Sequence, residues 1–317
     1  MKRCLLILPY FGYFNNYFQL FINSCEMNTS IEWLIYTDDK ANIKYPSNVH
    51  IKYCSFKEFK NKVDDKMGFH VSLDKPYKLC DIRPAYGYIF EEELQGYDYW
   101  GHCDCDLIFG DIQTVLQKLM NENWDKIFAV GHLSIYKNSI ENNRIFMNDY
   151  KGEKIYKKFM TNASPCWFDE DWKEINIVTL FLEAGKKIYL KDLSANPYGQ
   201  LAKFHLRKYI PENRNFITLP YKKGVFCWQD GKIIFYEKKG KKVVNEREYL
   251  YLHLQRRTML CNVGDLDKCY AIIPNKFIAI DKDIAQMPTW DWSMFSQIKK
   301  RIIAKIHRGL KKMGGKL

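Results

Sequence analysis

The strongest constraint on the fold is the alternation of short apolar runs with amphipathic segments through the first 130 residues. Cys4–Leu8 is a continuous apolar run, typical of a parallel strand buried on both faces. Further strands are expected at 31–36, 49–54, within 97–108 and at 127–130, and helices at 17–25, 82–94 and 112–120. This order predicts an α/β fold with an open, mostly parallel sheet flanked by helices, where ligands bind beyond the carboxyl ends of the strands.

A different pattern begins after residue 216. Val225–Gln229 and Ile233–Tyr236 flank the turn Asp230-Gly231, which is a strong signal for a β-hairpin. We therefore expect a small β-hairpin addition to the α/β fold. The predicted organisation is one domain over residues 1–260, a connecting segment over 261–292 and a tail over 293–317.

The tail is strongly basic. Lys and Arg exceed Asp and Glu by 12 in the whole chain, and eight positive charges without an acidic residue follow Asp291. Apolar residues recur there at steps of three or four: Phe295, Ile298, Ile302, Ile306, Leu310 and Met313. This pattern predicts an amphipathic helix in the plane of an anionic membrane surface. Packing on the protein's own core would explain the apolar stripe but not the charges, and nucleic-acid binding would not use the stripe.

Cysteine spacing bears on the compartment. The ten cysteines form no CxxC pair, and several lie within apolar runs, which favours reduced thiols and a cytoplasmic location. No apolar stretch approaches the roughly 20 residues that span a bilayer. Together with the basic tail, this predicts a peripheral protein on the inner face of the cytoplasmic membrane.

Two aspartates follow the predicted fourth strand. Asp104 and Asp106 are two residues apart, so an extended backbone places both on one face, while Cys103 and Cys105 point the other way. Neighbouring carboxylates repel each other unless a cation joins them, and Mg²⁺ or Mn²⁺ held by carboxylates and substrate phosphates is a common arrangement. A solvated turn is the alternative.

The motifs around these aspartates resemble a glycosyltransferase-like bacterial family of capsule and O-antigen loci, with the DxD motif of GT-A glycosyltransferases. The resemblance covers roughly residues 1–260 and rests on Leu8-Pro9-Tyr10-Phe11-Gly12, Tyr36-Thr37-Asp38, residues 77–84 and 99–106, Gly131-His132-Leu133 and residues 251–257. It implies a Rossmann-like GT-A fold. It also implies metal-dependent transfer of a hexose, such as galactose, from a nucleoside diphosphate sugar, with UDP favoured, to a lipid-linked glycan acceptor.

The resemblance also implies roles for single residues. Asp104, Asp106 and His253 would hold the metal. The donor would be contacted by Tyr10, Gly12, Thr37, Asp38, Asp81, Arg83, His132, Arg256 and Arg257. Arginine suits a diphosphate because its fork donates two parallel hydrogen bonds. The structural alternatives stay open: core packing for Tyr10, a simple turn for Thr37-Asp38, a helical ion pair for Asp81 and Arg83, and a structural role for either histidine.

An acidic cluster supplies candidates for a catalytic base. Asp169 and Glu170 lie between the aromatic residues Phe168 and Trp172. In an inverting transferase, one carboxylate takes the proton of the acceptor hydroxyl. A solvated acidic cap on a following helix is the alternative, and a retaining enzyme would need no such base.

Two other functions fit part of the sequence. A sugar-nucleotide nucleotidyltransferase also combines a parallel sheet with metal-binding carboxylates, but Pro9-Tyr10-Phe11-Gly12 is not a glycine-rich phosphate loop. A non-catalytic basic membrane-binding module would explain the tail, but not the intact Asp104, Asp106 and Arg83.

Overall fold

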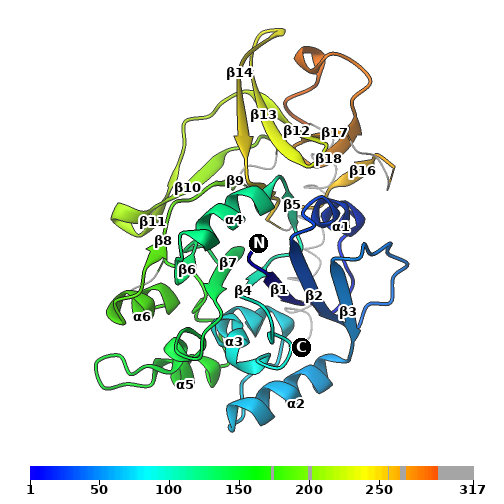
Figure 1. Ribbon diagram of the computed structural model, residues 1–317. Coiled ribbons are helices and arrows are strands. Elements are labelled where there is room, and N and C mark those ends of the chain that lie inside the picture. Colours follow the sequence, from blue (N-terminus) through cyan, green and yellow to red (C-terminus); the bar gives the residue numbers. More distant parts are fainter. Residues whose placement is uncertain (173–174, 199–201, 256, 265–268, 292–317) are drawn as a thin grey trace, which may run out of the picture.

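A computed structural model describes residues 1–172, 175–198, 202–255, 257–264 and 269–291. Its centre is a seven-stranded sheet with the order β3-β2-β1-β4-β7-β6-β8 (Figure 1). The strands are β1 (Cys4–Pro9), β2 (Ile31–Thr37), β3 (Val49–Tyr53), β4 (Tyr99–Cys103), β6 (Lys126–Ile127), β7 (Leu133–Lys137) and β8 (Ile188–Tyr189). The predicted α/β class is confirmed.

The central sheet is mixed. The expected parallel pairing holds from β3 through β2 and β1 to β4, and again between β6 and β8. β7 runs antiparallel to both of its neighbours, β4 and β6. Only residues 128–132 join β6 to β7, and so short a connection cannot make the crossover that a parallel pair needs.

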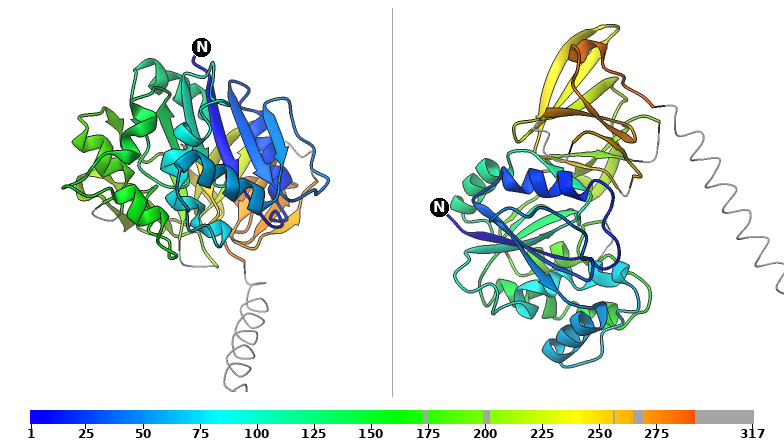
Figure 2. Two further views of the ribbon diagram at one scale, coloured as in Figure 1. Left: turned by 90° about the horizontal axis from the view of Figure 1, so that it is seen from below. Right: turned by 90° about the vertical axis from the view of Figure 1, so that its right-hand side faces the viewer.

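Helices lie on both sides of the central sheet. The α-helices are α1 (Phe18–Glu26), α2 (Phe56–Met67), α3 (Tyr86–Ile89), α4 (Ile112–Asn121), α5 (Ile155–Met160) and α6 (Ile177–Glu183). Short 3₁₀ helices are η1 (Pro76–Asp81), η2 (Arg83–Ala85), η3 (Asn142–Met147), η4 (Pro211–Asn213) and η5 (Ile284–Gln286). α1 and α4 separate the central sheet from a β-rich part, and α2 and α3 lie on the opposite side (Figures 1 and 2). The long helix expected at 82–94 is instead split between η2 and α3.

The expected fourth strand is also split, and this split creates the site described below. β4 ends at Cys103, and β5 (Leu107–Phe109) leaves the central sheet for a second sheet of order β11-β10-β9-β15-β5. Its other strands are β9 (Ser194–Pro197), β10 (Leu206–Ile210), β11 (Asn215–Thr218) and β15 (Tyr251–His253). Asp104-Cys105-Asp106 therefore forms the bend between two sheets.

The predicted hairpin is present in a third, six-stranded sheet of order β14-β13-β12-β17-β18-β16. β12 (Gly224–Gln229) and β13 (Lys232–Lys239) pair antiparallel, and positive φ angles of 46° at Asp230 and 80° at Gly231 fit the tight turn. The remaining strands are β14 (Lys242–Tyr249), β16 (Leu260–Asn262), β17 (Cys269–Ile273) and β18 (Lys276–Ala279). This sheet therefore contains strands from both sides of residue 260, the predicted end of the first domain.

Close packing of β4 depends on a glycine. A Cβ atom on Gly101 would lie 2.4 Å from the carbonyl oxygen of Ser134 in β7 and 2.8 Å from Leu6 in β1. Only a residue without a side chain fits between these neighbours. This close fit fixes the end of β4, from which the Asp104–Asp106 bend continues.

Among the described residues, no helix is both long and apolar enough to cross a membrane. The tail at 293–317, for which an amphipathic helix is predicted, lies outside the described residues.

Candidate metal centre

The structure brings Asp104 and Asp106 together with His253, a residue almost 150 positions later. β15 pairs antiparallel with β5, so that His253 lies opposite Leu107 and next to the bend. Backbone hydrogen bonds fix the bend on both sides: Asp104 N–H donates to the His132 carbonyl at 3.0 Å, and Leu254 N–H donates to the Asp106 carbonyl at 2.9 Å. Three possible metal ligands are therefore held by backbone pairing, before any metal binds.

The spacing of these groups fits an octahedral divalent ion. His253 Nε2 lies 3.5 Å from Asp106 Oδ1 and 3.7 Å from Asp104 Oδ2, and one ligand atom from each residue falls within 4.8 Å of the others. Ligands about 2.1 Å from an ion are separated by roughly 3–4 Å. Two carboxylates and an imidazole are a donor set that can hold a divalent ion.

The charge on His253 depends on the carboxylates. Burial opposes protonation, but Asp106 and Asp104 outweigh it and raise the pKa of His253 above its ordinary value. When it is protonated, His253 would offset part of the negative charge that a cation would otherwise neutralise. Its Nδ1 is buried and has no hydrogen-bond partner among the described residues.

Arg83 joins the Asp104–Asp106 bend to the acidic pair predicted as catalytic. Its guanidinium donates to Asp104, to Asp169 Oδ2 at 2.8 Å and to the Gly131 carbonyl at 3.0 Å. Burial opposes the charge, but Asp104 and Asp169 raise the pKa of Arg83 well above its ordinary value. These longer-range contacts, and not the helical ion pair with Asp81 that was the structural alternative, are the ion pairs that Arg83 makes among the described residues.

The acidic pair lies inside the protein instead of forming a solvated helix cap. Asp169 is buried and Glu170 half-buried, and both approach Gly131, where a Cβ atom would lie 3.0 Å from Asp169 and 3.2 Å from Glu170. Burial, and then the charge of Asp169, raise the pKa of Glu170 to about 7. Burial also raises the pKa of Asp169, against the opposing effect of Arg83. Because Arg83 already binds Asp169, Glu170 is the carboxyl group better placed to exchange a proton.

Asp81 has a structural role next to the acidic pair. We expected it to contact the donor, but its side chain is completely buried and bound to Lys78. It accepts hydrogen bonds from the backbone of Cys166 at 2.8 Å and Phe168 at 3.0 Å. Asp81 thus holds the segment that leads into Asp169.

Four of the residues expected to bind the donor lie at or just after the carboxyl ends of β1 and β2: Tyr10, Gly12, Thr37 and Asp38. β2, β1 and β4 are parallel neighbours, so the segments after their carboxyl ends share one edge of the central sheet. Gly12 N–H donates to Asp38 Oδ1 at 2.8 Å, which joins the loops after β1 and β2. Thr37 is buried, and the Tyr10 ring stacks on Phe14.

Asn15, which the sequence analysis did not single out, connects this edge of the central sheet to the bend that carries Asp104 and Asp106. Asn15 Nδ2 donates to the Cys105 carbonyl at 3.3 Å. The loop after β1 therefore touches the middle of the Asp104–Asp106 bend.

The remaining basic residues expected at the donor site are His132, Arg256 and Arg257. Burial, with the charges of His253 and Arg83, lowers the pKa of His132 well below its ordinary value, so the ring is neutral. His132 lies beside His253, with ring centroids 4.4 Å apart. Burial lowers the pKa of Arg257 to about 10, and its guanidinium lies over the Phe204 ring. Arg256 lies outside the described residues.

Tyr251 is a second residue that sequence reasoning missed. Its hydroxyl lies 2.9 Å from Nδ1 of His132. Tyr251 stands two positions before His253 on β15, so period-two alternation places both side chains on one face of the strand. That spacing could have identified Tyr251 once β15 was recognised as a strand.

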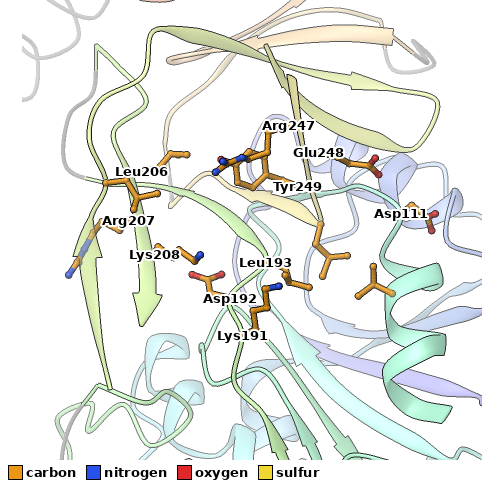
Figure 3. A pocket seen from close by; sticks show the side chains of 13 residues that line it. Asp111, Lys191, Asp192, Leu193, Leu206, Arg207, Lys208, Arg247, Glu248 and Tyr249 are labelled. Carbon is orange, nitrogen blue, oxygen red and sulfur yellow. The ribbon is translucent and has the colours of Figure 1, made fainter. Parts of the chain in front are cut away.

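A cavity of about 540 Å³ lies elsewhere, beyond the opposite ends of β5 and β15 (Figure 3). Asp111, Lys208, Arg247 and Tyr249 are among its lining residues, and none of the predicted site residues is. Its buried carboxylate, Asp192, accepts hydrogen bonds from Ser194 and from the backbone of Tyr209. Because this charge is already satisfied within the fold, the cavity is a weaker candidate site than the metal ligands.

Fold and site together define a mixed α/β protein with a candidate Asp-Asp-His metal centre at the edge of its central sheet. Residues 6–281 match the family described as "Family of unknown function (DUF6625)", and the protein belongs to this family. No curated protein matches the chain.

Two solved structures show distant similarity. Mouse xyloside xylosyltransferase 1 in its apo form is 8% identical, with a TM-score of 0.37, covering 62% of this chain and 87% of the mouse chain. A197 from STIV is 13% identical, with a TM-score of 0.24, covering 69% of this chain and 95% of that chain. Similarity this low does not decide the chemistry, which rests on the residues themselves.

We expect His253→Ala to weaken Mn²⁺ binding by roughly tenfold to a hundredfold, because it removes the only nitrogen among the three ligands. Isothermal titration calorimetry with Mn²⁺ measures this change. The matched control is His205→Ala, which removes a half-buried histidine stacked on Tyr221 and should leave the affinity unchanged. Equal affinities in both variants would exclude His253 from the metal centre.

Proposed function

We propose that the protein is a metal-dependent glycosyltransferase, which moves a hexose from a nucleoside diphosphate sugar to a hydroxyl group of a glycan. The observation that carries this proposal is the Asp104–Asp106–His253 cluster. Its ligands can hold a divalent ion, and it lies at the sheet edge where the loops after β1, β2 and β4 meet. That edge is where open α/β sheets bind nucleotides.

The proposed chemistry assigns the metal and Arg83 to the leaving group. A bound divalent cation would neutralise charge on the departing diphosphate. Arg83 already contacts Asp104 and lies beside the cluster, so its guanidinium is positioned to donate hydrogen bonds to the same diphosphate. Arg257 and His132 are further donor-side candidates. Of the nucleotides, UDP is favoured by the resemblance described above.

Glu170 is the proposed base for an inverting reaction. Its pKa of about 7 lets it accept the proton of an acceptor hydroxyl at neutral pH. Asp169 is already bound to Arg83, so it is better suited to hold the guanidinium than to take the proton.

A panel of nucleotide sugars, assayed for manganese-dependent release of the nucleoside diphosphate, tests the proposed function. We expect turnover of at least one donor, and its loss in Asp106→Asn, because an amide is a poorer metal ligand than a carboxylate. Asp65→Asn, a change at an exposed position on α2, is the control and should behave as wild type. In a parallel assay with nucleoside triphosphates and sugar 1-phosphates, release of pyrophosphate with formation of a nucleotide sugar would instead identify a nucleotidyltransferase. If the metal-loaded protein neither turns over nor binds a nucleotide, both the glycosyltransferase and the nucleotidyltransferase function are contradicted.

Glycosyl transfer should also depend on pH through Glu170. With a raised pKa, the base is ionised only above about pH 7, so the rate should rise as the pH increases through that value. Glu170→Gln should lower the rate by about 10²–10⁴-fold while donor affinity, measured by calorimetry, is retained. A variant with a near-native rate would exclude Glu170 as the base and favour a retaining reaction.

We further propose that the tail at 293–317 attaches the protein to the inner face of the cytoplasmic membrane, within reach of a lipid-linked acceptor for capsule or O-antigen synthesis. Support comes from the eight uncompensated positive charges and the apolar stripe in the sequence. Each cation near an anionic surface contributes about 1 kcal/mol. The binding should therefore weaken as salt screens the charges.

Truncation after Asp291 should release the protein from vesicles of anionic phospholipid, because it removes eight positive charges and the apolar stripe together. Vesicle flotation at low salt measures the binding, and nucleotide-sugar hydrolysis by the truncated protein is the control for an intact site. Equal flotation of the full-length and truncated proteins would show that the tail is not the anchor.

A further inference from the structure

Three large aromatic side chains reach the surface next to the acidic pair. Tyr77 and Trp172 are 47% and 45% exposed, and Trp167 is half-buried between them. Trp167 Nε1 donates to the Tyr77 hydroxyl at 3.3 Å, and the rings of Trp167 and Trp172 meet at 89° with centroids 5.7 Å apart. We call this set of Tyr77, Trp167 and Trp172 the aromatic patch.

The chain holds Trp167 in an unusual backbone conformation. Its φ of 56° lies in the left-handed region, which a bulky side chain rarely adopts. The buried carboxylate of Asp81 accepts hydrogen bonds from the residues on both sides, Cys166 and Phe168. Lys78 binds Asp81 and also donates to the Phe159 carbonyl at 2.7 Å. A buried ion pair therefore fixes a strained turn that presents Trp167 toward solvent, and such strain is concentrated at functional sites.

The patch borders the groups that would carry out the transfer. Trp167 and Trp172 are two positions from Asp169 and from Glu170, respectively. Trp172 N–H donates to the Glu170 carbonyl at 3.2 Å. Through Asp169, the same segment is bound to Arg83 and so to the metal ligands. A molecule resting on the patch would thus have its polar groups close to the proposed base.

We infer that the aromatic patch is the platform for the acceptor sugar, and that it takes a neutral pyranose ring by its apolar C–H face. This inference rests on the proposed function. Two rings at right angles form a corner that suits one ring-shaped ligand better than a flat surface. Indole and phenol also combine an apolar face with a polar N–H or O–H group, which matches the hydroxyls around a sugar ring. The neighbouring carboxylates disfavour an anionic sugar.

Saturation-transfer NMR on the full-length protein with UDP and diamagnetic Mg²⁺ tests the platform, using methyl β-D-galactopyranoside and methyl β-D-glucopyranoside as probes. We expect saturation transfer to at least one glycoside, strongest at the protons of one ring face. Trp172→Ala should weaken binding by roughly three- to tenfold, the range for loss of an aromatic contact, and Trp172→Phe should retain most of it. Because Trp172 is largely exposed, neither change should unfold the protein, which circular dichroism verifies.

The matched control is Trp290→Ala, which removes an aromatic side chain of similar exposure, 47%, outside the patch and should leave the glycoside signal unchanged. No saturation transfer in the wild type, or an equal signal in Trp172→Ala, would overturn the platform. Loss of vesicle binding in Trp172→Ala without any glycoside signal would overturn it in favour of a membrane contact. Trp172-dependent glycoside binding without manganese-dependent nucleotide binding would support the platform and overturn the proposed transferase.

Discussion

The candidate site depends on the two ion pairs that the guanidinium of Arg83 makes. The guanidinium bridges Asp104, at the bend between two sheets, and Asp169, in a segment 65 residues later. Without it, the carboxylates gathered there would repel one another across a largely buried space. Removing one partner of such a buried pair costs about 3–5 kcal/mol. One side chain therefore links Asp104, one of the three candidate metal ligands, to the acidic pair.

A second buried ion pair completes the arrangement. Lys78 and Asp81 lie in η1 with side chains almost fully shielded from water, and their fixed charges organise the turn around Trp167. Arg83 and Asp81 are thus neighbours in the chain with different tasks. Arg83 contacts a candidate metal ligand, and Asp81 positions the segment that carries Trp167, Asp169, Glu170 and Trp172.

The metal centre lies where two sheets meet, which links its formation to folding of the whole chain. Asp104 and Asp106 follow a strand of the central sheet, whereas His253 comes from β15, directly after the β-rich hairpins. The three ligands can assemble only after β15 has paired with β5. The β-rich part is consequently more than a peripheral addition, because it delivers the third ligand.

The sequence by itself determined the α/β class, the positions of the first four strands along the chain, the β12–β13 hairpin and the Asp104–Asp106 pair. These are set by local signals: apolar runs, an Asp-Gly turn and two carboxylates beside a buried strand. Only the tertiary structure decided that β7 runs antiparallel, that Arg83 binds Asp104 and Asp169, and that Asp169 is buried. Such contacts join segments tens of residues apart. Packing of the whole chain selects them, so no local pattern could have revealed them.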